Sequence, residues 1–311
     1  MANYITIDGG TTNTRLYLVC DYKIIDSIKL NIGAKKCAEG NTLLKNEIKK
    51  SINILLNKYD IKEEDITRIL ASGMITSEFG LCNLEHITTP AGIEELHNSM
   101  HEVMINDISS FIPFVFIRGV KYDKENVLET DVMRGEETEL FGIIEDFDSL
   151  YILPGSHSKI ISTDENGKIT YFKTMLTGEM IGALAENTIL KSAIDLSCEE
   201  IDSDFLKQGF SYCYTNGIND SLFKTRILSS FSHASKTEIY SYFLGVILCD
   251  EIKYILKKYA KNIYIGGRKQ IKEALFILLK YLTKNNVIML TDDVVDSSCV
   301  KGIIKIFEYN H

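Results

Sequence analysis

The sequence contains no tryptophan, only three prolines, and no apolar run of the length that a membrane span requires. Its seven cysteines are odd in number and scattered, without any Cys-x-x-Cys pair, which argues against a disulfide framework or a zinc site. The first residues lead straight into an apolar segment and show neither the basic nor the long apolar region of a secretory signal. We therefore predict a protein of the reducing cytoplasm that has no membrane partner.

Positive charge is also too sparse for a nucleic-acid partner. The 34 Lys and Arg residues are outnumbered by 43 Asp and Glu, whereas nucleic acids are bound by clustered positive charge. The hydrophobic share of 45% and the charged share of 25% are ordinary for a globular protein. At about 150 residues per domain, a chain of this length predicts two domains, which we place at residues 1–148 and 149–311. A homodimer is left open.

The beginning of the chain is its most informative segment. Apolar Tyr4–Ile7 leads into Asp8-Gly9-Gly10-Thr11-Thr12-Asn13-Thr14-Arg15 and then into apolar Leu16–Val19, a pattern that predicts a strand, a tight turn and a strand. Two glycines and several hydroxyls in one turn supply close backbone N–H groups and further donors, which suit phosphate. Asp8, at the end of the first strand, could hold a hydrated magnesium ion. The alternative is an ordinary hairpin in which these residues serve only the turn.

A second hairpin of the same kind begins the second predicted domain. Leu150–Pro154 reads as a strand, Gly155-Ser156-His157-Ser158-Lys159 as a polar turn, and Ile160–Ser162 as the returning strand. Further on, Asn262–Ile265 reads as a buried strand that opens through Gly266-Gly267 into a helix, where α/β sheets usually receive a ligand. Each half of the chain therefore carries a turn that could bind phosphate.

The rest of the chain alternates between helix-like and strand-like periodicity, which predicts a mixed α/β fold. We expect helices over 40–59, 134–144, 177–192, 235–259 and 269–283 and from about residue 294, and strands over 68–72, 114–117, 169–173 and 287–290. Thr177 is expected to cap its helix, and Ser235 with Glu238 forms a capping-box pattern. The start of the helix at 134–144 is rich in carboxylates, which the positive end of a helix dipole tolerates.

Together these motifs resemble the 2-dehydro-3-deoxygalactonokinase family. The resemblance rests on Asp8–Arg15, Gly73-Met74, Met133–Thr138, Leu153–Lys159 and Thr177–Glu179, which occur in the family's order across most of the chain. It implies membership of the superfamily of sugar kinases, acetate kinase, chaperone ATPases and actin. The implied fold has two actin-like (ribonuclease H-like) lobes, each a mixed β-sheet with flanking helices, with ATP and Mg²⁺ in the cleft between them. The N-terminal lobe would hold the first phosphate motif and the acceptor site, and the C-terminal lobe the second phosphate and adenosine motifs.

The resemblance further implies phosphorylation of 2-dehydro-3-deoxy-D-galactonate to its 6-phosphate in galactonate catabolism, with ATP as donor and this small sugar acid as partner. Asp8 would hold Mg²⁺ through water and count among the catalytic residues. The implied ATP contacts are Gly10, Thr11, Thr12 and Asn13 in the first turn, Gly155, Ser156, His157 and Ser158 in the second, and Gly266 and Gly267 at the adenosine. The chain departs from the family at Gly9, where an aromatic residue is common, and at Ile117-Arg118-Gly119, where a Pro-Gly turn is expected. Arg118 is either an acceptor contact or a surface arginine.

Phosphoryl transfer needs a group that accepts the hydroxyl proton. The candidates lie in Asp131–Glu137, and we rank Glu136 first and Asp131 second, the alternative being that these carboxylates cap the helix. Helical spacing places Glu136 and Glu139 on one face and Glu137 a third of a turn away, so all three are not expected in one site.

A cation is expected at the substrate carboxylate. Arg134 is the first candidate, with Arg15 and Lys159 as alternatives and Glu137 as a further substrate contact; each could instead form a structural ion pair. His157 is expected to form hydrogen bonds as a neutral group.

Two other functions remain open. One is a kinase of the same superfamily for another sugar acid or sugar, since only the acceptor pocket would differ. The other is a non-kinase ATPase that acts as a nucleotide switch. Activators of that class need cysteines placed for an iron–sulfur cluster, and chaperones need a peptide-binding region after the ATPase lobes; the sequence shows neither.

Overall fold

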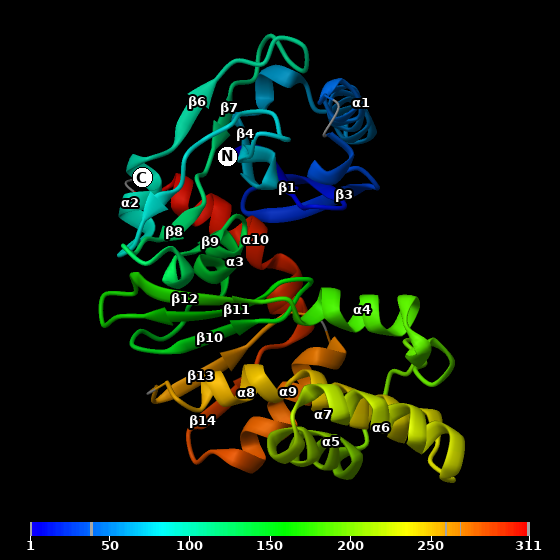
Figure 1. Ribbon diagram of the computed structural model, residues 1–311. Coiled ribbons are helices and arrows are strands. Elements are labelled where there is room, and N and C mark those ends of the chain that lie inside the picture. The colour runs from blue at the N-terminus through cyan, green and yellow to red at the C-terminus, as the bar shows by residue number, and fades with distance from the viewer. Residues whose placement is uncertain (1, 38–39, 259, 268, 310–311) are drawn as a thin grey trace. The chain divides into compact units, whose positions relative to one another are not determined.

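The computed structural model of the chain describes residues 2–37, 40–258, 260–267 and 269–309. These residues form two compact units, and their elements are labelled in Figure 1. Unit 1 comprises the residues up to Glu145, Glu165–Tyr171 and the residues from Asp293 onward. Unit 2 comprises Asp146–Asp164 and Phe172–Asp292.

Unit 1 is built on a six-stranded mixed sheet in the order β3-β2-β1-β4-β7-β6. Its strands are β1 (Asn3–Gly9), β2 (Thr14–Cys20), β3 (Lys23–Leu30), β4 (Arg68–Gly73), β6 (His101–Val103) and β7 (Phe114–Phe116). A smaller sheet, in the order β5-β8-β9, contains β5 (Ile87–Thr88), β8 (Val120–Tyr122) and β9 (Asp131–Met133). Strand β1 pairs antiparallel with β2 and parallel with β4, so the edge at which β1 and β4 both end carries Gly9 and Gly73.

Strand β1, in the middle of the six-stranded sheet of unit 1, is covered on both faces. Because side chains alternate along a strand, Ile5 and Ile7 of β1 share one face, where they join a core with Leu44 and Ile48 of α1 (Thr42–Lys58). The opposite face carries Tyr4, whose ring meets Phe307 of α10 (Asp292–Phe307) edge to face at 5.7 Å. The same alternation places the Asp8 side chain on the α10 side of the sheet.

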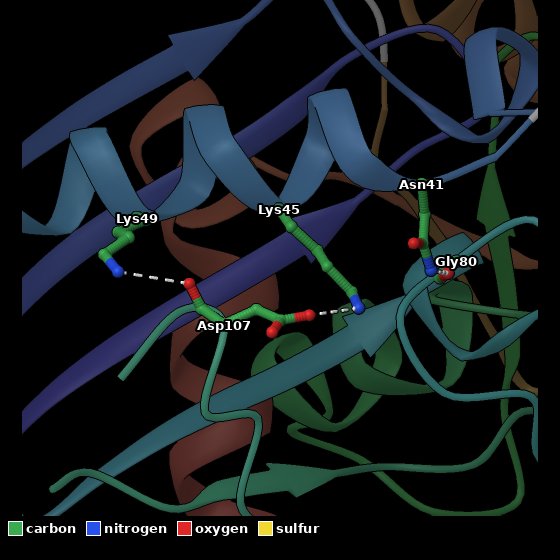
Figure 2. A network of polar contacts seen from close by, with 5 residues as sticks. All are labelled: Asn41, Lys45, Lys49, Gly80 and Asp107. Carbon is green, nitrogen blue, oxygen red and sulfur yellow. Dashed lines mark hydrogen bonds and ion pairs between the residues drawn. The ribbon is translucent and has the colours of Figure 1, made fainter. Parts of the chain in front are cut away.

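A set of polar contacts ties α1 to two loops (Figure 2). The Lys45 ammonium lies 2.8 Å from the Asp107 carboxylate, and the Lys49 ammonium donates to the Asp107 carbonyl oxygen at 3.3 Å. At the beginning of the helix, the Asn41 amide donates to the Gly80 carbonyl at 2.7 Å. Exposed ion pairs of this kind contribute roughly 0–1 kcal/mol, so the buried leucines and isoleucines of α1 hold it on the sheet and the lysines orient the loops.

Unit 2 repeats the plan with a five-stranded sheet in the order β12-β11-β10-β13-β14. Its strands are β10 (Leu150–Leu153), β11 (Ser158–Thr163), β12 (Ile169–Met175), β13 (Asn262–Ile265) and β14 (Asn286–Met289). Its helices are α4 (Thr177–Asn187), α5 (Ser203–Asn216), α6 (Ile218–Phe231), α7 (Lys236–Ile247), α8 (Cys249–Ile255) and α9 (Lys269–Leu282). Again the first strand pairs antiparallel with the second, and parallel with a later strand that leads into glycine.

Most of the predicted elements are confirmed. Both hairpins, the strands at β4, β7, β12, β13 and β14, and the helices α1, α9 and α10 lie where the periodicity placed them. Ser235 and Glu238 form the expected capping box at α7. Strand β3 and helices α5 and α6 were not predicted.

Four local predictions are wrong. Asp131 lies on strand β9, and α3 begins only at Glu136 and ends at Ile143, so Asp131 is outside the first helical turn. Ser158 and Lys159 begin strand β11, because the turn closes within Pro154–His157. Thr177 is the first helical residue, not the cap, and α4 ends at Asn187 before a 3₁₀ turn.

The fourth concerns the long helix predicted over 235–259, which is divided into α7 and α8 on either side of Leu248. The end of that prediction, Tyr259, lies outside the described residues.

The compact units also differ from the division at residue 148. The change of unit comes after Glu145, and the last helix returns to unit 1. The reason is close packing of α10 against α3: a Cβ on Gly142 would lie 1.9 Å from the Ser298 carbonyl oxygen, and one on Gly302 would lie 1.8 Å from that of Thr138. Within the described parts of the chain, no helix combines the length and apolar character needed to cross a bilayer.

Candidate active site

The turn after β1 is held by its own backbone. The Gly10 N–H donates to the Asn13 carbonyl at 2.8 Å, and the Gly10 and Thr11 carbonyls accept from the N–H groups of Ala34 and Lys35 at 3.2 and 3.0 Å. The side chains of Thr11 and Thr12 are exposed. The exposed hydroxyls of Thr11 and Thr12, together with backbone N–H groups of the turn, are the groups suited to meet an anionic ligand.

Strand register places Asp8 opposite Arg15 of β2 and Ser72 of β4. Paired residues of neighbouring strands direct their side chains to the same face, so these three lie together. Burial raises the pKa of the Asp8 carboxyl, the positive charge of Arg15 opposes this shift, and Glu136 adds to it. Asp8 is therefore a half-buried acid whose main counter-charge is one exposed arginine.

Three glutamates of α3 belong to the same electrostatic cluster: Glu136 acts on Asp8, and Asp8, Glu136 and Glu137 all act on Glu139. Burial raises the pKa of Glu139 to about 8, and the charges of Asp8, Glu136 and Glu137 add to the shift. Burial likewise raises the pKa of Glu137 to about 8, with Glu136 as the largest charge that contributes. The site therefore concentrates carboxylates that repel one another in surroundings of low polarity.

The hydrogen bonds of α3 distinguish these glutamates. Both carboxylate oxygens of Glu137 accept from the Gly135 N–H, at 2.8 and 2.9 Å, and Oε1 also accepts from the Ser72 hydroxyl at 3.3 Å. Glu136 Oε2 accepts from the Arg134 N–H at 3.0 Å. The expectation that some of these carboxylates satisfy the helix start is thus confirmed, and Glu137 is the one most fully committed to it.

Sequence reasoning placed Glu139 on the helix face of Glu136 without giving it a role, and it missed two further participants. Glu139 interacts electrostatically with Asp8, Arg15, Glu136 and Glu137, so the three glutamates lie close enough to interact although helical spacing predicted that they would not share one site. Burial raises the pKa of Tyr17 to about 12, and Arg15 forms a hydrogen bond with its side chain. Cys299 of α10 is buried 3.6 Å from the Thr138 hydroxyl, and burial raises its pKa well above that of a free thiol. Neither Tyr17 nor Cys299 has a local sequence signal.

The side chains of two predicted residues form their hydrogen bonds outside this cluster. Asp131 accepts from the Val132 N–H on β9, and its charge acts on Tyr171. Arg134 donates from NH1 to the carbonyl and hydroxyl of Thr76, both at 2.8 Å, and from NH2 to the Leu84 carbonyl at 2.7 Å. Both terminal nitrogens of Arg134 therefore hold backbone segments of unit 1.

Arg118 has a similar place. It donates from Nε to the Ser99 carbonyl at 2.9 Å and from NH1 to the Glu85 carbonyl at 3.1 Å. These bonds make it a brace between loops of unit 1.

The turn of the second hairpin lies against the beginning of α4. The Glu179 N–H donates to the Ser156 carbonyl at 3.1 Å, and His157 Nε2 lies 3.3 Å from Glu179 Oε1. A Cβ on Gly178 would lie 2.1 Å from the Gly155 carbonyl oxygen, so only glycine allows this approach. The turn and a helix N-terminus thus form one surface of the kind that binds anions.

The residues of the second hairpin that were predicted to contact ATP or substrate divide between this turn and strand β11, which follows it. Gly155, Ser156 and His157 are in the turn, whereas Ser158 and Lys159 are buried in β11. The Ser158 hydroxyl donates to Glu251 at 2.5 Å, and the Lys159 ammonium donates to the Thr174 hydroxyl at 2.7 Å.

The predicted adenosine motif follows β13. The Gly266 N–H donates to the Ile152 carbonyl at 2.9 Å, which brings Gly266 to the edge of the sheet where β10 also ends. Gly155 follows at that same edge, after β10. Both glycine motifs of unit 2 therefore lie at the carboxyl ends of adjacent parallel strands, where open α/β sheets bind ligands.

In the described portion of the chain, no group of three or more His, Cys, Asp or Glu side chains has the geometry to hold a metal ion. Magnesium ordinarily takes only one or two protein carboxylates and completes its shell with water and substrate phosphates. Asp8 is suited to that kind of site.

The fold and these two turns define the class of the protein. Each unit opens with a strand, a glycine-led turn and a second strand beside a parallel strand, as in the actin-like ATPases and sugar kinases. A Sinorhizobium meliloti protein provisionally described as a 2-dehydro-3-deoxygalactonokinase matches the fold with a TM-score of 0.79 and 20% identity, over 98% of each chain. The activator of 2-hydroxyisocaproyl-CoA dehydratase from Clostridium difficile, solved with bound ADPNP, matches with a TM-score of 0.51 and 13% identity, over 98% of this chain and 95% of that one.

Sequence comparison gives the particular family. The family model of 2-keto-3-deoxy-galactonokinase matches residues 8–302. The 2-dehydro-3-deoxygalactonokinase of Escherichia coli K12 is 25% identical over 271 residues, which are 85% of this chain and 86% of that protein. The chain belongs to the 2-keto-3-deoxy-galactonokinase family, a family of kinases. The predicted fold class, family and enzyme class are confirmed.

Proposed function

We propose that this protein transfers the γ-phosphoryl group of ATP to the 6-hydroxyl of 2-dehydro-3-deoxy-D-galactonate. The observation that carries the proposal is the place of Asp8: it ends β1 beside a glycine-threonine turn and faces Arg15 in a cluster of carboxylates, in a chain of this kinase family. The E. coli relative carries the substrate in its name. Such a reaction needs charge neutralisation, positioning and a proton acceptor, and the chain has candidates for each.

The phosphates of ATP would meet the two turns. In unit 1, Gly10, Thr11, Thr12 and Asn13 offer exposed or half-exposed groups on a turn whose carbonyls are engaged internally. In unit 2, the contacts would come from Gly155, Ser156 and His157, with Gly266 and Gly267 at the adenosine. Ser158 is not among the proposed ATP contacts, because its hydroxyl donates to Glu251.

Asp8 would hold Mg²⁺, and the charge of the site supports this. Glu136 adds negative charge beside Asp8, and Arg15 is the cation that offsets it. A divalent cation would relieve this excess, so the residues present fit magnesium. When bound, the ion would neutralise charge on the phosphates.

Glu136 is the proposed proton acceptor. It is the first residue of α3, it is half-buried, and its charge acts on both Asp8 and Glu139. Glu137 is a poorer candidate because both of its oxygens accept from the Gly135 N–H. Glu139 is the second candidate because it interacts with both Asp8 and Glu136; with a pKa of about 8 it is mostly protonated at pH 7, so only its ionised fraction would accept a proton. Asp131 is dropped because it lies on β9, outside the interactions of Asp8 and Glu139.

Recognition of the substrate carboxylate stays a prediction. Arg134 would act mainly by holding backbone, given its bonds to Thr76 and Leu84. Arg15 is shared with Asp8, and Lys159 with Thr174. An arginine or lysine that binds the substrate carboxylate would, when replaced, raise KM for the acid and leave KM for ATP nearly unchanged.

The compartment and partners follow from the same proposal. The seven cysteines are all free thiols, which supports a reducing cytoplasm. The partner would be a small sugar acid, and a homodimer stays a prediction.

The test is ADP release by the purified protein with ATP and Mg²⁺. The acceptors compared are 2-dehydro-3-deoxygalactonate, its gluconate epimer, other sugar acids, hexoses and no acceptor. Release that depends on the galactonate compound supports the proposal, and preference for another acceptor would replace the substrate while keeping the kinase. Release without any acceptor would favour the second candidate function, a nucleotide switch. The similarity in fold to the dehydratase activator is the reason to include this control.

A further inference from the structure

A buried carboxylate in unit 2 has no part in the reaction proposed above. Glu251, on α8, is 2% exposed, and its two oxygens accept from the hydroxyls of Ser158 and Thr177, each at 2.5 Å. Both hydroxyl residues are themselves buried. Burial raises the pKa of Glu251, and the two hydroxyl bonds oppose this shift.

The two partners of Glu251 flank the second phosphate turn. Ser158 is the first residue of β11, directly after the turn, and Thr177 is the first residue of α4. Between them the turn and the helix are already in backbone contact, through the Glu179 N–H to Ser156 bond and the close approach of Gly178 to Gly155. One carboxylate therefore joins the strand on one side of this contact to the helix on the other.

Burying a carboxylic acid at this position is unfavourable for stability. Removing a carboxylate from water costs free energy, and apolar residues of similar volume often replace buried charged groups without loss of stability. What such a replacement cannot reproduce is two directed bonds to two chosen hydroxyls. Fixing backbone donors before the ligand arrives is how enzymes make such sites effective, because no reorganisation is then needed.

We propose that Glu251 is a positioning residue that seats the Gly155–His157 turn on the first turn of α4, so that the backbone of both is preset for the phosphates of ATP. The proposal rests on the proposed function for its ligand. Its structural half, the seating of the turn, is independent of that function and can be measured without nucleotide.

The first test compares Glu251→Ala with Ser158→Ala and Thr177→Val, which each remove one of the two bonds. The expected result is a rise in KM for ATP of roughly tenfold for the first variant and about threefold for each of the others, with KM for the sugar acid changed less than twofold. Glu251→Gln keeps one oxygen acceptor and the shape of the side chain, so it should recover part of the loss.

Ser241→Ala is the matched control. Ser241 lies on α7 in the same unit, is buried, accepts from the Asp202 N–H at 2.8 Å and donates to the Thr237 carbonyl at 2.7 Å. The Ser241→Ala variant loses a comparable pair of buried hydrogen bonds, neither of which involves the Gly155–His157 turn. It should lower the melting temperature yet leave KM for ATP unchanged.

The second test is amide hydrogen exchange without nucleotide. Exchange at 155–159 and 177–179 should be at least severalfold faster in Glu251→Ala, and in Thr177→Val if the former folds poorly, but unchanged there in Ser241→Ala. Unchanged exchange in folded Thr177→Val and Ser158→Ala would overturn the seating role. Faster exchange with an unchanged KM for ATP would overturn its link to ATP. Failure of the wild-type protein to bind ATP would instead refute the proposed function, and the exchange result would still decide the seating role.

Discussion

Glu137→Gln should change how the stability of this protein depends on pH. Glu137 is fully buried, its ordinary pKa is 4.5, and burial raises the pKa to about 8 in the folded protein. A carboxyl with a raised folded pKa binds its proton more tightly in the folded than in the unfolded chain. Its stabilising contribution is therefore fully present below pH 4.5 and is lost as the pH rises towards about 8.

The magnitude follows from that interval. Each pH unit between the two pKa values is worth roughly 1.4 kcal/mol, so the wild-type protein should lose up to about 5 kcal/mol across this interval through this one group. The glutamine variant cannot ionise at position 137, so its stability should not show this loss with rising pH. Its poorer acceptance of the Gly135 N–H should cost about 1 kcal/mol at every pH.

Urea unfolding followed by circular dichroism is the suitable assay, since the chain has no tryptophan to report by fluorescence. Measured without nucleotide or Mg²⁺ at pH 5, 7 and 8.5, the variant should be similar to or slightly less stable than wild type at pH 5 and clearly more stable at pH 8.5. A difference between the two proteins that stays constant with pH would show that Glu137 is ionised in the folded state throughout. The reasoning from burial would then be refuted.

Three further results are expected. Asp8→Asn should reduce kcat by roughly a thousandfold or more while leaving the melting temperature unchanged or higher, because it removes one of several mutually repelling charges; near-normal turnover would take the magnesium role from Asp8. Glu136→Gln should lower kcat by about 10²- to 10⁴-fold with little effect on KM for ATP, and a matching loss in Glu139→Gln alone would move the base to Glu139. Arg134→Ala should destabilise the protein by roughly 2–3 kcal/mol in thermal unfolding, since it leaves the buried acceptor groups at Thr76 and Leu84 unpaired; an unchanged stability would favour the substrate role.

Features that depend on short stretches of chain were predictable. The two hairpins are visible because apolar strands and glycine-rich turns alternate within fewer than twenty residues, as at Tyr4–Val19 and Leu150–Ser162. The capping box at Ser235 needs only four residues to be recognised. The family resemblance rests on the same short motifs, in order.

What escaped prediction depends on packing between distant segments. Ser158 looked like a turn residue because it is polar, yet it is buried in β11, where Glu251, 93 residues further on, accepts its hydrogen bond. Cys299 comes close to Thr138 only because glycines let α10 and α3 approach each other. Arg134 looked like a substrate ligand, and its bonds to Thr76 and Leu84 arise from loops about fifty residues away. Polarity alone does not distinguish a residue that meets a ligand from one that satisfies a buried partner.

The two units use acidic side chains in different ways. Around the turn of unit 1, Asp8, Glu136 and Glu139 lie together with Arg15 as counter-charge, an arrangement that costs stability and is suited to a cation and a proton. Behind the turn of unit 2, Glu251 has two neutral hydroxyl partners, an arrangement suited to holding backbone in place. Replacing an acid in unit 1 should therefore lower kcat, whereas replacing Glu251 should raise KM for ATP. Hairpins of the same form are thus combined with a charged cluster in unit 1 and with two directed hydrogen bonds to a carboxylate in unit 2.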